Sequence, residues 1–436
     1  MIYATAASGL VGILLLLGLL LGGARIGAAL GIVGLVGLAI VLGPEAALIK
    51  SGVVLVDTLT RYELGTLPLF LFMAHIFFSI DASRDLFDAA AKFLGHRKGG
   101  LAYASIAGCG GFGAINGSSL ATTATVGLVA YPEMKRRGYD DRLATGTIAA
   151  GGTLGQMIPP SGALIVFGII AETSIGTLFT AAIIPGITQA LFYALVVFIL
   201  VRWKPHLATT GDRASWGERW RALARIWEII VIVVLVISGI SMGWISPAEA
   251  AAIGSAGALL TAAIRRKLTK QALFTAFHET LRTTGLIYLI LLGALLFSVF
   301  VGVTGLAVSA GEFVESLSLG TVGTLILVAL ILLLLGSVLD GLALMLLTTP
   351  ILLPIVEATG LTAIWFGIFI TRAMEIGFVH PPLGMNLYII QGVAKDVSIT
   401  RIFKGVIPFL MSDFVHLLLI ILFPAIVLWL PEYLGS

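Results

Sequence analysis

The sequence is poor in charge and nearly free of cysteine. Of its 436 residues, 11% are Asp, Glu, Lys or Arg, whereas about a quarter are charged in a typical soluble domain. The single cysteine, Cys109, excludes an internal disulfide and a cysteine-based metal cage. So little charge excludes a separate aqueous catalytic domain and is typical of an integral membrane protein.

Signals of enzymatic chemistry are also scarce. Residues 239–243 fit the G-x-S-x-G pattern of a hydrolase nucleophile, but they end a hydrophobic segment and no Asp and His pair is placed to assist. No Walker A lysine motif occurs, so direct drive by ATP is not supported. No basic, aromatic-interleaved stripe is typical of nucleic-acid binding. The sequence therefore predicts no enzyme, no organic cofactor and no nucleic-acid partner.

Apolar residues, in contrast, are abundant. They make up 58% of the chain, and the mean hydropathy is +1.08. One bilayer crossing takes about 20 apolar residues, so the chain has room for about ten to a dozen crossings. The predicted fold class is an all-α polytopic membrane protein. The predicted crossings are 5–24, 27–46, 64–80, 142–170, 177–201, 226–245, 248–264, 283–308, 361–393 and 405–431.

The basic residues predict how the chain lies in the bilayer. If the first crossing runs from outside to inside, all 26 Lys and Arg except Lys50, Arg61 and Arg372 fall on the inner side. This asymmetry follows the positive-inside rule. The formal net charge of +3 therefore reflects the orientation of the chain in the bilayer and says little about the charge of a binding partner.

Two apolar stretches, 99–132 and 316–356, do not fit as simple crossings. Basic residues flank the first at both ends, and two full crossings with a turn need about 40 residues, more than it provides. Polar residues stand at the two centres, at 116–119 and at 340–341. We therefore predict two re-entrant helical hairpins whose polar tips are buried in protein or line a cavity.

An internal repeat relates the two halves of the chain. A shift of 222 positions superposes 132–162 on 354–384 without a gap. The identities are mainly glycine and proline, which fix backbone shape: Pro132/Pro354, Gly138/Gly360, Ile148/Ile370, Gly155/Gly377, Pro159/Pro381, Pro160/Pro382 and Gly162/Gly384. The predicted halves are 1–201 and 226–436, with a cytoplasmic linker at 202–225. Because each half has an odd number of crossings, the repeat is inverted, as in many secondary transporters.

The paired prolines predict a broken helix in each half, at about 142–170 and about 361–393. Unwound backbone offers carbonyl oxygens to a cation such as Na⁺, and the next half-helix offers a partly positive N-terminus to a carboxylate. One ion site per half, with an anionic substrate between them, is the hypothesis. The predicted ion-binding residues are Asn116, Gly117, Ser118, Ser119, Thr153, Gly155, Pro159, Asp340, Gly341, Gly377, Pro381 and Gly384. The predicted substrate-binding residues are Asn116, Thr122, Ser161, His380 and Asn386.

Some titratable residues leave alternatives open. Asp340 is an intramembrane carboxylate, for which ion binding or proton relay is favoured over a structural hydrogen bond. Arg372 and Glu375 are three residues apart on one predicted helix, which favours a structural ion pair. His75 and His416 stand alone in apolar segments and are interpreted as satisfied core histidines.

Five segments carry a specific combination of residues: 112–122 (FGAINGSSLAT), 151–162, 167–186, 243–251 and 375–387. In this order they resemble the large membrane (M) subunit of tripartite ATP-independent periplasmic (TRAP) transporters. The resemblance implies an elevator-type, Na⁺-coupled importer whose hairpins and broken helices form the mobile transport domain. It also implies two partners, a small four-helix membrane (Q) subunit and a periplasmic substrate-binding protein. Asn116 departs from the family's frequent serine, and His380 from its common threonine.

The sequence therefore predicts the permease subunit of a binding-protein-dependent importer of organic carboxylates. Its coupling ion is Na⁺, and it has no cofactor. It is expected in the bacterial inner membrane, with the N-terminus in the periplasm. The alternative is a stand-alone Na⁺- or H⁺-coupled organic anion carrier of similar inverted-repeat architecture.

Overall fold

The computed structural model describes residues 5–337 and 339–435, and every regular element in these residues is helical. This confirms the predicted all-α fold class. The elements are α1 (Ala6–Leu21), α2 (Ile26–Leu42), α3 (Pro44–Thr60), η1 (Tyr62–Gly65), α4 (Thr66–Ser79), α5 (Ala82–Leu94), α6 (Gly100–Asn116), α7 (Ser119–Arg136), α8 (Asp141–Met157), α9 (Gly162–Ile170), α10 (Ile175–Trp203), η2 (Pro205–Leu207), α11 (Trp216–Leu223), α12 (Trp227–Ser241), α13 (Pro247–Ile264), α14 (Lys270–Thr304), α15 (Leu306–Ser316), α16 (Gly320–Gly336), α17 (Gly341–Glu357), α18 (Ala363–Val379), α19 (Met385–Val393), α20 (Ile399–Leu422) and α21 (Ala425–Leu434).

Several of these helices are long and apolar enough to cross a membrane. Among the described residues there are five by length and composition, or seven if each of two bent pairs is one crossing. The five are η1 with α4, α10, α13, α14 and α20, and the bent pairs are α8 with α9 and α11 with α12. Five shorter apolar helices, α1, α2, α16, α17 and α21, accompany them. The chain is a multi-pass membrane protein.

Two helices differ from the crossings expected in their regions. α14 begins at Lys270 rather than near 283, because the Thr269 side chain caps its first turn. The crossing expected at 405–431 is interrupted at Pro424, which has no backbone N–H to continue a helix. The length of an apolar run does not show where a polar side chain caps the start of a helix, nor where a helix is briefly interrupted.

Two further helices, α3 and α5, lie between the expected crossings. α5 is amphipathic, with its apolar residues on one face, whereas in α3 polar residues such as Lys50, Ser51 and Asp57 interrupt the apolar ones, so neither helix forms a long apolar run. The exposed apolar side chains of α3 are Leu48, Ile49, Val53, Leu55, Val56 and Leu59. On α5, the carboxylate of Asp85 accepts a hydrogen bond from Arg265 (2.7 Å), which also contacts Glu228 at 3.2 Å. These ion pairs tie α5 to the ends of α12 and α13.

The segment 202–225 joins α10 to α12 and contains α11. Ser215 caps α11 in a capping box with Glu218, and Lys92 of α5 donates to the Glu218 carboxylate at 3.0 Å. The backbone hydrogen bond from Ser215 and the hydrogen bond from Lys92 lower the pKa of Glu218 to about 2. The segment is thus fastened to the side of the molecule that carries α5.

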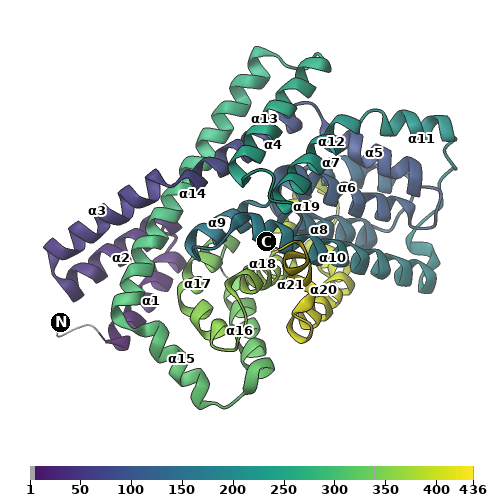
Figure 1. The fold of residues 1–436 in the computed structure, drawn as a ribbon. Coiled ribbons are helices and arrows are strands. Elements are labelled where there is room, and N and C mark those ends of the chain that lie inside the picture. Colours follow the sequence, from purple (N-terminus) through teal and green to yellow (C-terminus); the bar gives the residue numbers. More distant parts are fainter. Residues whose placement is uncertain (1–4, 338, 436) are drawn as a thin grey trace.

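α2 and α14 pack with their backbones in close contact. A Cβ on Gly27 would lie 2.9 Å from the carbonyl oxygen of Leu289, and one on Gly34 would lie 2.7 Å from the Phe297 nitrogen. Small residues permit this approach in membrane bundles. Figure 1 shows α14 running diagonally from α4 and α13 toward α1 and α15. It links the two peripheral groups of helices.

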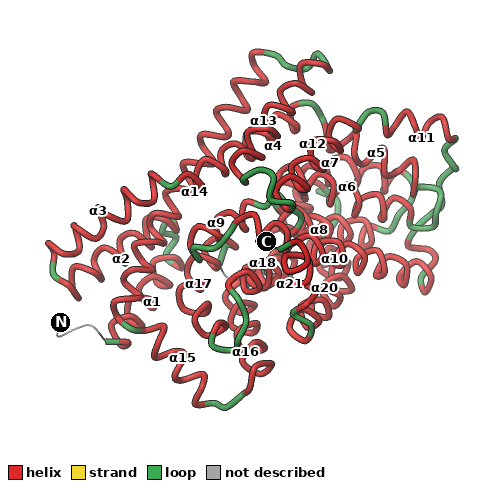
Figure 2. Tube along the Cα trace, viewed as in Figure 1, coloured by secondary structure: helices red, strands yellow, loops and turns green. Residues whose placement is uncertain are grey.

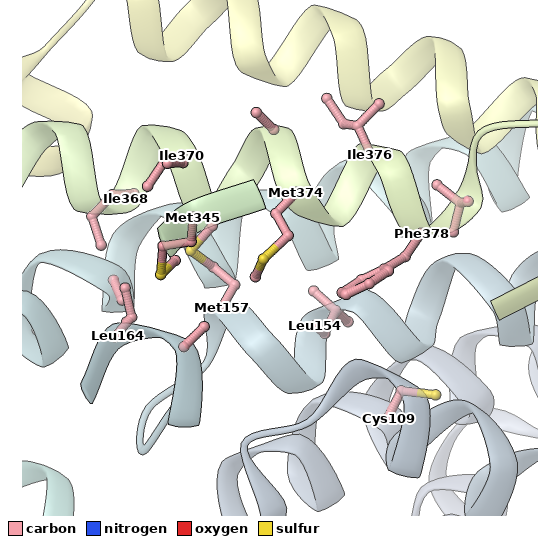
Figure 3. Close-up of a cluster of buried hydrophobic side chains, with 14 of the residues drawn as sticks. Cys109, Leu154, Met157, Leu164, Met345, Ile368, Ile370, Met374, Ile376 and Phe378 are labelled. Carbon is pink, nitrogen blue, oxygen red and sulfur yellow. The ribbon is translucent and has the colours of Figure 1, made fainter. Parts of the chain in front are cut away.

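The two hairpins, α6 with α7 and α16 with α17, pack against broken helices in the centre of the molecule (Figure 2). The first hairpin contacts α8, and the second contacts α18. Figure 3 shows Met374 and Phe378 of α18 directed toward Leu154 and Met157 of α8. These side chains are buried, so an apolar layer separates the two broken helices.

Candidate functional site

The turn of the first hairpin is organised by Asn116. Its Oδ1 accepts a hydrogen bond from the Ser118 backbone N–H (2.6 Å), and its Nδ2 donates to Thr122 Oγ1 (3.0 Å). Gly117 takes the left-handed conformation, with φ of +63°, and ends α6. Ser118 then caps α7 by accepting from the Ala121 N–H at 3.4 Å. The turn therefore has a defined shape and presents the N-terminus of α7 at its tip.

This turn is seated in the break of the first broken helix. α8 ends at Met157 and α9 begins at Gly162, with an angle of 43° between them. The Gly117 carbonyl oxygen accepts from the Gly162 N–H at 3.4 Å, and a Cβ on Gly117 would lie 2.5 Å from the Pro160 carbonyl oxygen. Ser161 caps α9 by accepting from Leu164 N at 3.4 Å. Two helix N-termini, those of α7 and α9, therefore lie side by side.

Glycines on α8 let the hairpin approach the helix backbone. A Cβ on Gly155 would contact Thr122 Oγ1 and would lie 2.9 Å from the Ser118 carbonyl oxygen. A Cβ on Gly152 would contact Thr123 Oγ1. These hydroxyls occupy the space that a side chain would fill. The predicted residues Thr122 and Gly155 are thus brought together beneath the turn.

Asn386 of α19 joins the second half of the chain to this site. Its Nδ2 donates to Ser119 Oγ (2.9 Å) and to the Ala149 carbonyl oxygen (3.0 Å). Asn386 is fully buried, yet its Oδ1 has no hydrogen-bond partner, and neither has Thr123 Oγ1 nearby on α7. Buried oxygens without a donor are costly unless something else satisfies them.

The turn of the second hairpin contacts α18 in a related way. The Asp340 carboxylate caps α17 by accepting from Ala343 N at 3.4 Å. A Cβ on Gly377 would lie 2.7 Å from the Gly336 carbonyl oxygen, and one on Gly341 would lie 2.7 Å from the Phe378 ring. Glycines at the ends of α16 and α17 and on α18 therefore let the second hairpin pack closely against α18, just as glycines on α8 do for the first hairpin.

The break between α18 and α19 spans residues 380–384. Gly384 donates its N–H to the His380 carbonyl oxygen at 2.9 Å, and a Cβ on Gly384 would lie 2.7 Å from the Phe378 carbonyl oxygen. His380 ends α18, and its Nδ1 is buried without a partner. Pro381-Pro382 is cis, as is Pro159-Pro160 in the first break.

Thr153, predicted as an ion-binding residue, faces a different environment. Its hydroxyl lies 2.8 Å from Tyr193 OH and accepts from Gln189 Nε2 at 2.9 Å. Gln189 Nε2 also lies 3.0 Å from the Glu375 carboxylate. The structure therefore joins Thr153 to a polar cluster on α10 and α18 and does not place it in contact with the hairpin turn.

In that cluster, Arg372 donates to Glu375 at 2.8 Å, which confirms the predicted ion pair. Arg372 also pairs with Asp413 of α20, a carboxylate that sequence reasoning missed. All three side chains are essentially inaccessible to solvent. The available signal was a lone aspartate inside an apolar crossing, which is a functional candidate by default.

A cavity of about 910 Å³ lies between the first hairpin turn and the peripheral helices α4 and α14. The turn contributes Asn116, Gly117 and Ser118, whereas Thr269 and Gln271 line the cavity where α14 begins. Leu342, directly after the second turn, also lines it. Both hairpins therefore border one space.

The cavity involves only one of the predicted substrate-binding residues, Asn116. Thr122, Ser161 and Asn386 are fully buried behind the turn, and His380 lies at the break of α18.

The opposite wall of the cavity carries residues that sequence reasoning did not assign to it. His75 of α4 and Glu279 of α14 line this wall, and Gln156 lies on the side of α8. The interpretation of His75 as a satisfied core histidine is wrong, because its Nε2 is buried without a partner. His416 does sit in the core, with Nε2 2.8 Å from Thr188 Oγ1, but its Nδ1 is likewise buried without a partner, so it is only partly satisfied.

The model of the DctM component of tripartite ATP-independent periplasmic transporters matches residues 13–426 of the chain. The chain belongs to this family. Among DctM-type proteins, it is 33% identical over 384 residues to the C4-dicarboxylate TRAP transporter large permease protein of Pseudomonas aeruginosa, covering 87% of this chain and 89% of the relative. It is 31% identical over 377 residues to the sialic acid TRAP transporter large permease protein SiaM of Vibrio cholerae, covering 86% of this chain and 88% of that relative.

The resemblance in the sequence is thus confirmed, and this DctM-type chain is a TRAP large permease subunit, not an enzyme. Among solved structures, the YdaH transporter of Alcanivorax borkumensis gives a TM-score of 0.56 at 15% identity, covering 84% of this chain and 88% of that one. That likeness shows the fold alone.

Proposed function

We propose that this permease carries an organic carboxylate into the cell together with Na⁺ by an elevator motion of the hairpins and broken helices. The observation that carries the proposal is the seating of the first hairpin turn in the break of α8 and α9, with a related contact of the second turn on α18. Such breaks supply carbonyl oxygens and helix N-termini within one structural unit. That unit can hold a cation and an anion and move as one body.

The first Na⁺ site in this proposal lies beneath the turn at Ser119. The oxygens available there are the Ser119 hydroxyl, the unpartnered Asn386 Oδ1 and the unpartnered Thr123 Oγ1. Neutral oxygens of this kind suit a hard monovalent cation better than a transition metal. A bound Na⁺ would also satisfy oxygens that otherwise have no donor.

The second Na⁺ site lies between Asp340 and the break at 380–384. This part of α18 ends in carbonyl groups, and the Asp340 carboxylate is part-buried at the start of α17. A cation beside Asp340 would offset the cost of a carboxylate within the membrane.

The carboxylate solute would bind in the 910 Å³ cavity. The N-termini of α7 and α9 reach its wall at Ser118 and Gly162, and a helix N-terminus carries about half a positive charge. The cavity also reaches Thr269 and Gln271, beside the basic residues Arg265 and Lys267. We infer that this end is the cytoplasmic one, so the conformation is open inward, in an inner membrane with the N-terminus in the periplasm.

We further propose that a small four-helix membrane subunit and a periplasmic substrate-binding protein complete the transporter. The exposed apolar side chains of α3 support a membrane partner on that side. The test is reconstitution of the chain with both partners in liposomes and measurement of solute uptake. Uptake should require the binding protein and an inward Na⁺ gradient, and it should stop when K⁺ replaces Na⁺. Uptake without the binding protein would favour a stand-alone carrier.

Replacing Ser119 with alanine should weaken the response to Na⁺. Loss of one oxygen from a cation site is expected to raise the half-saturating Na⁺ concentration about tenfold, equivalent to about 1.4 kcal/mol. The control is Ser105→Ala, because Ser105 is equally buried but its hydroxyl donates within its own helix, to Leu101 O at 2.8 Å. An unchanged Na⁺ response in Ser119→Ala would remove this residue from the site.

Replacing Glu279 with glutamine should improve the uptake of an anion. Among the described residues, Glu279 is the only Asp, Glu, Lys or Arg that lines the cavity. Its charge repels a carboxylate by roughly 0.5–1 kcal/mol at a high effective dielectric, so the KM should fall about twofold to fivefold. Initial uptake rates over a range of solute concentrations give this value. The exposed Glu312→Gln serves as control, and an equal KM in the two variants would contradict the repulsion.

A further inference from the structure

A groove of about 950 Å³ lies between α5, the C-terminal part of α7 and the segment that contains α11. We call it the linker groove, and its lining residues lie within 84–95, 128–137 and 212–225. It shares no lining residue with the 910 Å³ cavity. Its walls carry seven Lys or Arg and five Asp or Glu. The positive-inside rule assigns this basic surface to the cytoplasmic side of the membrane.

The charges in the linker groove do not cancel. The paired groups are Lys92 with Glu218 (3.0 Å), Arg136 with Glu133 (2.6 Å), Arg137 with Glu133 (2.8 Å) and Asp85 with Arg265 (2.7 Å). Salt bridges among the described residues leave out four lining arginines, Arg84, Arg213, Arg221 and Arg225, and two lining carboxylates, Asp88 and Asp212. These arginines outnumber these carboxylates, so the groove has an excess of positive charge and attracts anions.

A buried arginine adds to this excess. Arg219 of α11 is 6% exposed, and its guanidinium lies 5.7 Å from the Phe93 ring of α5 and 5.0 Å from the Trp216 ring. The contact with Phe93 is a cation–π interaction that holds α11 against α5. Within the described part of the chain, Arg219 Nε and Nη2 are buried without an acceptor. The residue before it, Glu218, lines the groove, so the charge of Arg219 lies close by.

Part of the groove wall is apolar. α7 contributes Leu128, Val129 and Pro132 before its charged end begins at Glu133. Leu128 is largely exposed. A molecule that fills the groove therefore meets apolar surface along α7 and arginine side chains on α5 and the linker. An anion with an apolar chain can bury this surface, whereas an inorganic anion cannot.

Exposed tryptophans indicate that the segment beside the groove lies at the membrane surface. Trp216 and Trp220 are four residues apart, so they share one face of α11. Trp203 and Trp227 stand at the two ends of the segment, and all four side chains are more than half exposed. Tryptophan is enriched at the level of the lipid headgroups, and a helix that combines it with basic residues is typical of an interfacial segment. Lipid headgroups therefore come within reach of the groove.

We propose that the linker groove binds an anionic glycerophospholipid of the cytoplasmic leaflet. Its phosphate diester accepts hydrogen bonds from the unpaired arginines, which suit phosphate because each guanidinium offers two parallel donors. An acyl chain lies along α7 at Leu128. The lipid thus joins the second helix of the first hairpin to the linker. Figure 1 shows α11 at the opposite end of the molecule from α3, so a small subunit on α3 leaves the groove open. This proposal does not depend on Na⁺ coupling or on the solute.

Native mass spectrometry of the purified, delipidated protein tests the proposal. The protein is titrated with phosphatidylglycerol or with phosphatidylcholine of the same acyl chains, and the dissociation constant of the first bound lipid is measured. Phosphatidylglycerol should bind about tenfold more tightly, because it alone has a net negative charge. Inorganic phosphate at an equal concentration should not displace it. Equal affinity for the two lipids would overturn the proposal, and so would displacement by phosphate, because the site would then bind the free anion.

The double variant Arg213→Gln/Arg221→Gln locates the site. Each lost arginine should weaken the binding of phosphatidylglycerol about fivefold, and the variant should keep the wild-type melting temperature without lipid, because no salt bridge is broken. The matched control, Arg202→Gln/Lys204→Gln, removes the same charge from exposed residues of the same segment that do not line the groove, and it should keep the wild-type affinity. Wild-type affinity in the first variant, or an equal loss in both, would overturn the proposal.

Discussion

Replacing Gly117 with valine should abolish Na⁺-driven uptake, with a loss of about a hundredfold or more, because displacement of a functional group by about 1 Å can cost that much. Gly117 has φ of +63°, which costs an L-residue roughly 1–2 kcal/mol. Its Cβ would lie 2.5 Å from the Pro160 carbonyl oxygen and 3.0 Å from the Gly162 nitrogen, both backbone atoms that cannot rotate away. The turn would leave the break.

The matched control is Gly138→Val. Gly138 has φ of +75°, so valine there has a similar conformational energy cost in the backbone. The atom nearest to a Cβ at this position is Thr209 Cγ2, at 3.9 Å. Uptake in liposomes is compared per amount of folded protein. If Gly117→Val were as active as Gly138→Val, the seating of the turn in the break would have no role in transport.

Replacing Asn386 with leucine should also cause a large loss of uptake. The variant removes the donors to Ser119 Oγ and to the Ala149 carbonyl oxygen, and it removes a proposed Na⁺ ligand. Each buried acceptor left without a donor costs about 1–3 kcal/mol. Both the melting temperature and the apparent affinity for Na⁺ should therefore fall.

The control for Asn386→Leu is Thr348→Val. Thr348 is buried, but its hydroxyl donates only within its own helix, to Leu344 O at 2.7 Å. It should lose little stability and keep the wild-type response to Na⁺. If the folded fraction of Asn386→Leu kept the wild-type half-saturating Na⁺ concentration, Asn386 would be a structural residue alone.

The sequence was informative where function depends on local backbone shape. Glycine and proline act within a few residues, so the turn at Asn116–Ser119 and the segments around Pro159 and Pro381 could be located from their pattern. Family membership could also be predicted, because specific segments recur in a fixed order. The roles of the individual site residues in binding ions and substrate remain predictions.

Contacts between distant elements could not be predicted. Gln189 and Glu375 are 186 residues apart, and nothing in either local sequence indicates that they meet. His75 and Glu279 share a cavity wall only because α4 packs against α14. Thr153 follows the glycines of the break in sequence, but helical rotation turns it toward α10. Side-chain direction at this level depends on tertiary packing.

The most direct measurement is the steady-state accumulation of solute in liposomes at a series of imposed Na⁺ gradients, with the membrane potential clamped. Two Na⁺ sites that move with one solute predict that the logarithm of the solute ratio rises with the logarithm of the Na⁺ ratio with a slope near two. A slope of zero would contradict Na⁺ coupling, and the hairpin turns and helix breaks would then need another role.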